Sequence, residues 1–196
     1  MHSKKFNINY LTKIAMLTAI AVVLMYLELP LPIFPAFLKI DLSDLPALLG
    51  GFALGPLAAV IIQLLKNIIH FIVKNDGTGG IGNLANFLVG CALAVPAAII
   101  YLKNKSLKNA IIGMVAGVFS LVAIAALANY FLLWPLYVKL IGFDALVGMS
   151  SEANDKIDSV GTYILYAIVP FNALKGIIVC VITGFIYKPL SKLLHK

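Results

Sequence analysis

Five long runs of uncharged, mostly apolar residues constrain the fold of this chain more than any other feature. They cover residues 14–27, 45–65, 84–102, 109–138 and 159–187, and only Lys175 interrupts the last one. A helix needs about 20 apolar residues to cross a bilayer, and most of these runs approach or exceed that length. With 62% apolar and 12% charged residues, the chain has too much apolar surface for a soluble domain of its size. The sequence predicts an all-α integral membrane protein, with residues 1–196 forming a single membrane domain.

The first run could be mistaken for a signal peptide because it follows a basic N-terminus. It ends in YLELPLP, which offers no small-x-small cleavage site. We therefore expect it to be a retained transmembrane helix.

Lysine placement predicts the orientation in the membrane. All fifteen basic residues are lysine, and nine of them form three clusters without acidic neighbours. These nine are Lys4, Lys5, Lys13, Lys103, Lys105, Lys108, Lys188, Lys192 and Lys196. By the positive-inside rule the clusters, and with them both termini, are expected on the cytoplasmic side of a bacterial cell membrane. The net charge of +7 is then a topology signal, and nucleic-acid binding is not expected because no basic face interleaves with aromatic residues.

This orientation requires an even number of crossings. Residues 45–73 must begin and end outside, but one straight helix of that length would end on the wrong side. Gly50-Gly51 and Gly55-Pro56 are strong helix breakers within that stretch. We therefore expect a short, broken second helix, and a ligand pocket near the extracellular side. The six expected helices cover residues 11–29, 45–54, 57–73, 84–102, 108–138 and 160–188.

Polar residues inside the apolar runs are the candidate binding groups. Asn129 lies among aromatic residues, and Asn172 and Lys175 lie one helical turn apart after Pro170. A lone ammonium in a bilayer is costly, so Lys175 should face a cavity or a partner. Alternatively, the asparagine bonds backbone or another helix, and the lysine bonds carbonyls of a neighbouring helix. The residue pattern favours a ligand role for the three together.

A second polar group follows one face of the third expected helix. Gln63, Lys66, Asn67 and His70 share this face, and Lys66 is again a lone cation in an apolar run. His70 has no second His or Cys at ligand spacing on that helix, so no metal site is expected. We interpret the stripe as a pocket wall or as helix–helix hydrogen bonding.

Two loops and one small-residue face complete the candidates. Residues 29–41 are rich in proline and aromatic residues and would suit a lid. The glycine-rich turn 77–82 would allow a ligand to approach the backbone closely, but it lacks the Gly-Lys-Ser/Thr of a phosphate-binding loop. Ala15 and Ala19, four residues apart, would allow tight helix packing, although alanine as simple filler fits the spacing equally well.

Catalytic patterns are missing from the sequence. It contains no HExxH, no paired-Asp metal motif and no Ser or Cys nucleophile near a suitable His. We expect a protein that is not an enzyme and that has no cofactor or ATP site of its own. A stand-alone secondary carrier or small channel remains as an alternative, but carriers usually show repeated halves and a mid-membrane acid, whereas the acids here are expected outside.

Three segments resemble a known family. KIDLSDLPALLGGFALGPLAAVIIQLLKNIIH (39–70), GTGGIGNLANFLVG (77–90) and PFNALKG (170–176) are similar to the riboflavin-specific substrate-binding subunit of energy-coupling factor (ECF) transporters. The likeness spans nearly the whole chain. It implies a high-affinity vitamin-capture protein that works with a transmembrane coupling subunit and two ATPases, for uptake of riboflavin and, as an open question, of riboflavin monophosphate (FMN).

The resemblance also implies roles for individual residues. Asn129, Asn172 and Lys175 match the polar side chains that hold flavin in that family, while Asn83 stands where GELANF-like relatives have Glu. The backbone around Leu42 and the turn 77–80, with Thr78 and Gly79, would lie near the ligand. Ala15 and Ala19 match the motif that docks such subunits on the coupling subunit.

Flavin chemistry suits these residues. Isoalloxazine needs apolar walls for its dimethylbenzene edge, and donors and acceptors for its uracil-like edge, which amides and an ammonium supply. Another vitamin, such as thiamine or pantothenate, is the alternative within the family. Cationic thiamine fits poorly beside Lys175.

Overall fold

The computed structural model describes residues 7–74 and 78–194, with side chains described as far as residue 187. Expectations for Lys4, Lys5, Gly77 and Lys196 fall outside this range. The main helices are α1 (Ile8–Tyr26), α2 (Asp44–Leu54), α3 (Pro56–Val73), α4 (Ile81–Lys103), α5 (Leu107–Ala128), α6 (Trp134–Ile141), α7 (Phe143–Ser151), α8 (Val160–Tyr163) and α9 (Val169–Leu194). Two π-helical segments continue these helices: η1 (Asn129–Leu133) and η2 (Ile164–Ile168).

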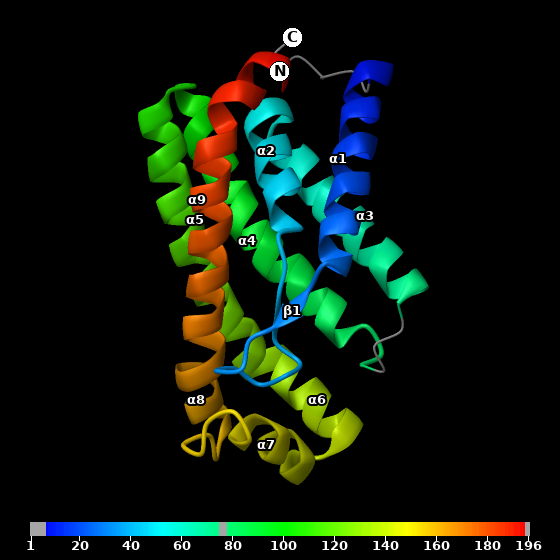
Figure 1. Cartoon of the computed structure of the whole chain (residues 1–196), viewed down its shortest axis with the longest axis vertical. Helices are drawn as coiled ribbons and strands as arrows, with labels where there is room; N and C mark the ends of the chain where they lie inside the picture. Colours follow the sequence, from blue (N-terminus) through cyan, green and yellow to red (C-terminus); the bar gives the residue numbers. More distant parts are fainter. Residues whose placement is uncertain (1–6, 75–77, 195–196) are drawn as a thin grey trace.

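Within the described residues, five helical segments are long and apolar enough to cross a membrane. They are Ile8–Tyr26, Pro56–Val73, Ile81–Lys103, Leu107–Ile141 and Val160–Tyr187. The apolar helix α2 has 11 residues, about 16 Å of helix, which is short for a hydrocarbon core of about 30 Å. The start of α1 and the end of α9 lie at the same end of the molecule (Figure 1).

Helices α2 and α3 are separated by a single residue with a special backbone. Gly55 has φ +106°, a conformation that L side chains rarely adopt, and its N–H bonds the carbonyl of Gly51. Pro56 occupies the first position of α3, where a helix does not need a backbone N–H donor. The chain therefore turns sharply here.

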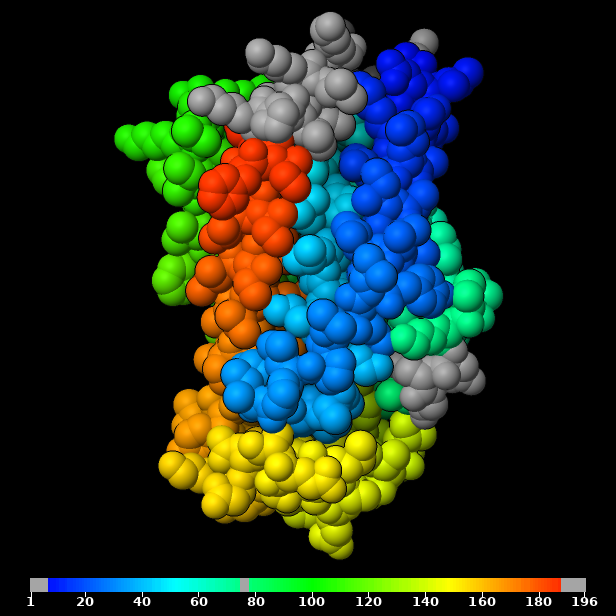
Figure 2. All heavy atoms as spheres, viewed as in Figure 1, coloured from blue at the N-terminus to red at the C-terminus, as the bar shows by residue number. Residues whose placement is uncertain are grey.

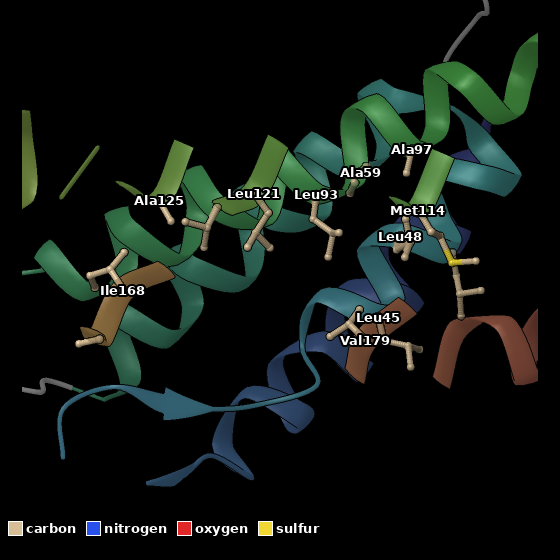
Figure 3. Packing of buried hydrophobic residues seen from close by; sticks show 14 of the residues in the cluster. Leu45, Leu48, Ala59, Leu93, Ala97, Met114, Leu121, Ala125, Ile168 and Val179 are labelled. Carbon is tan, nitrogen blue, oxygen red and sulfur yellow. The ribbon is translucent and has the colours of Figure 1, made fainter. Parts of the chain in front are cut away.

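The hydrophobic core lies where α2, α4, α5 and α9 meet. Figure 3 shows Leu48, Leu93, Leu121 and Val179 among the side chains that fill this space. Helices α4 and α5 approach closely because Gly113 and Gly117 face the α4 backbone. A Cβ at Gly113 would lie 2.6 Å from the carbonyl oxygen of Ala97, so only glycine fits this crossing.

The two π-helical segments share one cause in the sequence. Each ends two residues before a proline, with η1 ending at Leu133 before Pro135 and η2 ending at Ile168 before Pro170. Proline has no N–H donor and its ring crowds the carbonyl four residues earlier, so the preceding turn widens. π-Bulges of this kind are frequent at functional sites.

A short hairpin connects α1 to α2. Strands β1 (Leu29–Pro30) and β2 (Lys39–Ile40) pair antiparallel, with Leu29 opposite Ile40. Between them the buried Phe34 packs edge-to-face on Phe171 of α9, with ring centroids 5.3 Å apart. On the visible face in Figure 2 the hairpin lies low in the middle, directly above the yellow segment that contains α7. The hairpin is formed by the proline-rich and aromatic-rich residues 29–41, for which the sequence suggested a lid.

Candidate ligand-binding site

A pocket opens beneath the hairpin, between the hairpin, α3, α4, η1 and the start of α9. Its volume is about 140 Å³, smaller than the roughly 300–1,000 Å³ usual for ligand sites. The described lining residues are Met25, Glu28, Phe37, Leu38, Lys39, Asp41, His70, Gly82, Asn83, Ala85, Asn86, Val89, Asn129, Tyr137, Tyr163, Ile168, Phe171, Asn172 and Lys175.

Asn129 and Asn172 line this pocket in matching geometry. Each is buried and donates its side-chain N–H to the carbonyl four residues earlier, Ala125 and Ile168 respectively, at 2.8 Å. Asn129 is the first residue of η1, and Asn172 lies one turn after the end of η2, so both are at places where the regular backbone bonding is disturbed. A carboxamide has two N–H donors and an acceptor oxygen, so each side chain keeps hydrogen-bonding capacity for a guest.

Lys175 also lines the pocket, and it is not the lone cation that the apolar run suggested. Its Nζ donates to Asp41 Oδ2 at 2.9 Å and lies 3.1 Å from Asp44 Oδ2. The two carboxylates, which the sequence analysis expects on the outer side of the membrane, are buried in the protein at or just before the start of α2. A buried ammonium needs such partners because its desolvation is costly.

Lys66 pairs with the other oxygen of the Asp44 carboxylate. Its Nζ lies 2.6 Å from Asp44 Oδ1 and 2.7 Å from Ser43 Oγ, and its side chain is fully buried. Gln63 donates to the same Oδ1 at 2.9 Å. Lys66 is not among the described residues that line the pocket, so the polar stripe of α3 is divided between helix packing and pocket wall.

The pocket end of that stripe is His70, which meets Asn83 of α4. His70 Nδ1 and Asn83 Oδ1 lie 2.9 Å apart, and the ring of Tyr26 packs beside the imidazole. His70 Nε2, Asn83 Nδ2 and Asn86 Oδ1 are buried and have no hydrogen-bond partner among the described residues. Unpaired buried polar atoms are costly, so this group is suited to bind a guest with hydroxyl groups.

At the mouth of the pocket, Glu28 joins the hairpin to the end of α3. Its Oε1 accepts hydrogen bonds from Lys39 of β2, at 2.7 Å, and from Lys74. Burial raises the pKa of the Glu28 carboxyl, but the two lysines outweigh it and hold that pKa below its usual range. This ion-pair group fixes one side of the hairpin.

Aromatic rings form the apolar wall of the pocket. Phe37 of the hairpin lies 6.4 Å from Tyr137 and 6.3 Å from Tyr163, measured between ring centroids, and Phe171 holds the hairpin through Phe34. The site therefore combines flat apolar surfaces with amides, an imidazole and one ammonium. This chemistry suits a planar, polar, largely uncharged ligand.

Other residues singled out in the sequence are not in the described lining of the pocket. Leu42 is half-buried next to Asp41, Thr78 Oγ1 accepts from the Gly82 N–H, and Gly79 has φ +61° in the turn before α4. Ala15 and Ala19 are exposed on the outer face of α1. Among the described residues no group of three or more His, Cys, Asp or Glu side chains is arranged to hold a metal.

Sequence reasoning missed Asp41, Asp44 and the ion pairs of Glu28, whereas His70 lies in the pocket wall, which is one of the two interpretations given for the α3 stripe. The signal for the first two was available: two acids open an apolar run, and two lysines lie in apolar runs elsewhere. Buried ions are usually paired, so the sequence could have suggested that these acids and lysines neutralise one another, without showing which pairs form.

Comparison with known proteins shows extensive similarity. Residues 9–187 match the family model described as "ECF transporter, substrate-specific component". The riboflavin transporter RibU of Staphylococcus aureus (strain TCH60) is 33% identical over 186 residues, which are 95% of this chain and 92% of that protein. The riboflavin transporter FmnP of Bacillus subtilis (strain 168) is 32% identical, covering 94% and 93%. A solved S component of a bacterial ECF transporter superposes with a TM-score of 0.74 at 33% identity, covering 96% of this chain and 98% of that one.

Proposed function

This chain belongs to the family of ECF transporter substrate-specific components, and from that premise we propose that it captures riboflavin for uptake into the cell. The family is a transporter component and not an enzyme. Two relatives that match nearly the whole chain are named riboflavin transporters. The observation that carries the proposal is the pocket, where Asn129, Asn172 and Lys175 come together from two distant helices beside an aromatic wall.

In the proposed complex, these three side chains bind the uracil-like edge of isoalloxazine. Lys175 donates to a ring carbonyl oxygen, and the two carboxamides supply matched donors and acceptors. The dimethylbenzene edge lies against the aromatic wall. Asn83 binds a ribityl hydroxyl together with His70, and the backbone at Leu42, Thr78 and Gly79 approaches the ligand as the hairpin adjusts.

We further propose a topology with six crossings, in which α2 is the short second one. The lysine clusters then lie on the cytoplasmic side with both termini, and the pocket opens outward. An introduced cysteine at Glu152, which is exposed, should be labelled by a membrane-impermeant reagent from outside, and one at Ser106 should not. Labelling at Ser106 would contradict this topology.

Uptake also requires a coupling partner, because neither the sequence nor the pocket offers an ATP site. We propose that the exposed Ala15 and Ala19 form the contact with a transmembrane coupling subunit that works with two ATPases. Replacing both with Leu should abolish uptake in cells and leave the riboflavin affinity of the isolated chain near normal. Loss of both properties would show that this face packs internally.

The main test uses the purified full chain in detergent, without ATP. Riboflavin fluorescence should be quenched on titration with the protein, with thiamine and biotin as competitor controls that leave the signal unchanged. Displacement by thiamine, or no quenching, would overturn the assignment to riboflavin. FMN titrated in the same way shows whether a phosphate is accepted.

A further inference from the structure

Asp44 contacts the pocket lysine but is not among the described residues that line the pocket. We propose that Asp44 is a positioning residue: it holds the Lys175 ammonium in the pocket wall and acts on the ligand only through that lysine. The inference rests on the proposed riboflavin binding, and it assigns a role to an acid that does not touch the ligand.

The geometry supports this role because Asp44 is itself held rigidly. Its Oδ1 accepts from Lys66 at 2.6 Å and from Gln63 at 2.9 Å, which leaves Oδ2 directed at Lys175 at 3.1 Å. The side chain of Asp44 is fully buried, so water does not compete for these contacts. A lysine side chain is long and has many rotamers, and a fixed carboxylate reduces the entropy lost when a ligand binds it.

Asp41 completes the frame from the pocket side. Its Oδ2 accepts from Lys175 at 2.9 Å, and its Oδ1 accepts from the Ser43 N–H at 2.7 Å. The Lys175 ammonium therefore lies between two carboxylates that belong to the same short segment, 41–44. An ammonium has three N–H donors, so two carboxylate contacts leave a third donor for a ligand.

Charge balance explains why two acids are needed. Lys66 and Lys175 carry two positive charges, and Asp41 and Asp44 carry two negative ones, so the buried group is neutral. One acid alone would leave an uncompensated ammonium away from water. Asp44 lies between the two lysines, and Lys66 neutralises part of the Asp44 charge. Asp44 therefore does not fully neutralise Lys175, which can still bind a polar ligand.

A double-mutant cycle tests the proposal on the purified full chain, with riboflavin fluorescence quenching as the readout. Asp44→Asn should raise the dissociation constant on the order of 10- to 100-fold. In the Lys175→Met background the same change should have no further effect, because Asp44 acts through the missing ammonium. The proposal would be overturned if the affinity losses of Asp44→Asn and Lys175→Met multiplied in the double variant. It would also be overturned if Asp44→Asn bound riboflavin as tightly as the wild type.

Charge balance supplies the second variant, since Asp44→Asn alone leaves two ammonium groups and one carboxylate. Asp44→Asn combined with Lys66→Met is neutral and keeps the Lys175–Asp41 pair. Its thermal stability should exceed that of Asp44→Asn, while its affinity stays at least about 10-fold below wild type. Affinity restored together with stability would mean that Asp44 serves only Lys66, and the inference would be wrong.

The wild-type chain separates failure of the proposed function from failure of this inference. If the wild-type chain does not bind riboflavin, the proposed function is wrong and the inference with it. If the wild-type chain binds riboflavin tightly and Asp44→Asn binds it equally well, only the inference is wrong.

Discussion

Lys66 and Lys175 look alike in the sequence and differ in the structure. Both are single cations in long apolar runs, both are buried, and both contact Asp44. Lys175 lines the pocket and is also bonded to Asp41, whereas Lys66 donates to Ser43 and is outside the described lining. The difference shows that burial and charge do not identify a ligand group; the partners and the neighbouring cavity do.

The largest expected effect is on stability, at Lys66. Lys66→Met removes one partner of a fully buried ion pair and leaves the two acids with a single ammonium, which costs about 3–5 kcal/mol of unfolding free energy. Riboflavin affinity should fall by less than in Lys175→Met, because Lys66 is outside the described pocket lining and reaches the ligand only through Asp44 and Lys175. Thermal unfolding in detergent and the fluorescence titration measure the two effects. An affinity loss larger than that of Lys175→Met would place the site along α3.

The next largest effect is on affinity, at Lys175. Lys175→Met keeps the apolar stem and removes the donors, so a ligand carbonyl loses its partner at a cost of about 1–3 kcal/mol. This corresponds to a dissociation constant that is roughly 5- to 150-fold larger. The loss of stability should be smaller than at Lys66, since water in the pocket can hydrate Asp41. Equal affinity losses at both lysines would remove the distinction between them.

A smaller effect separates pocket asparagines from structural ones. Asn67, Asn129 and Asn172 are all buried and each donates to the carbonyl four residues earlier at 2.8 Å, but Asn67 is outside the described lining. Asn172→Ala should weaken binding by about 1–2 kcal/mol, roughly 5- to 30-fold, and Asn67→Ala should not. If Asn67→Ala and Asn172→Ala lost comparable riboflavin affinity in the fluorescence titration, the asparagines would act through helix stability.

The smallest effect is expected at the mouth of the pocket, where Glu28 is less buried than the inner acids. Because its folded-state pKa lies below the unfolded value of about 4.3, its stabilisation is present above that pH and is lost as pH falls through the folded pKa. For a partly exposed pair the contribution is at most about 1 kcal/mol. The melting temperature of Glu28→Gln should be slightly below wild type at pH 7, and the difference should vanish toward pH 3. A difference that grows in acid would contradict this sign.

Much of the helical framework follows from local chemistry. The apolar runs predict membrane helices, and Gly55 with Pro56 marks a sharp turn, since Gly55 has a backbone conformation that L side chains rarely adopt. Pro135 and Pro170 lie in helical runs and account for the π-helical turns before them. These features depend on a few consecutive residues, so the sequence displays them directly.

The site could be anticipated only in part. Asn129, Asn172 and Lys175 attract attention because polar groups are expensive in an apolar run, and all three line the pocket. The spacing of residues gives no hint that His70 faces Asn83 or that Glu28 bonds Lys74, because each contact depends on how two helices and a hairpin meet. Helix crossing is decided by close packing at small residues such as Gly113, far from the site.

The sequence by itself determined the class of the protein, the apolar runs that predict its helices and the polar residues that burial makes costly. Only the tertiary structure decided which charges neutralise one another. Lys175 and Asp41 are 134 positions apart, and Lys66 and Asp44 are 22 apart. Electrostatic pairing acts over a few ångströms in space and leaves no periodicity along the chain, so the short segment 41–44 acquired its role only when α2 packed between α3 and α9.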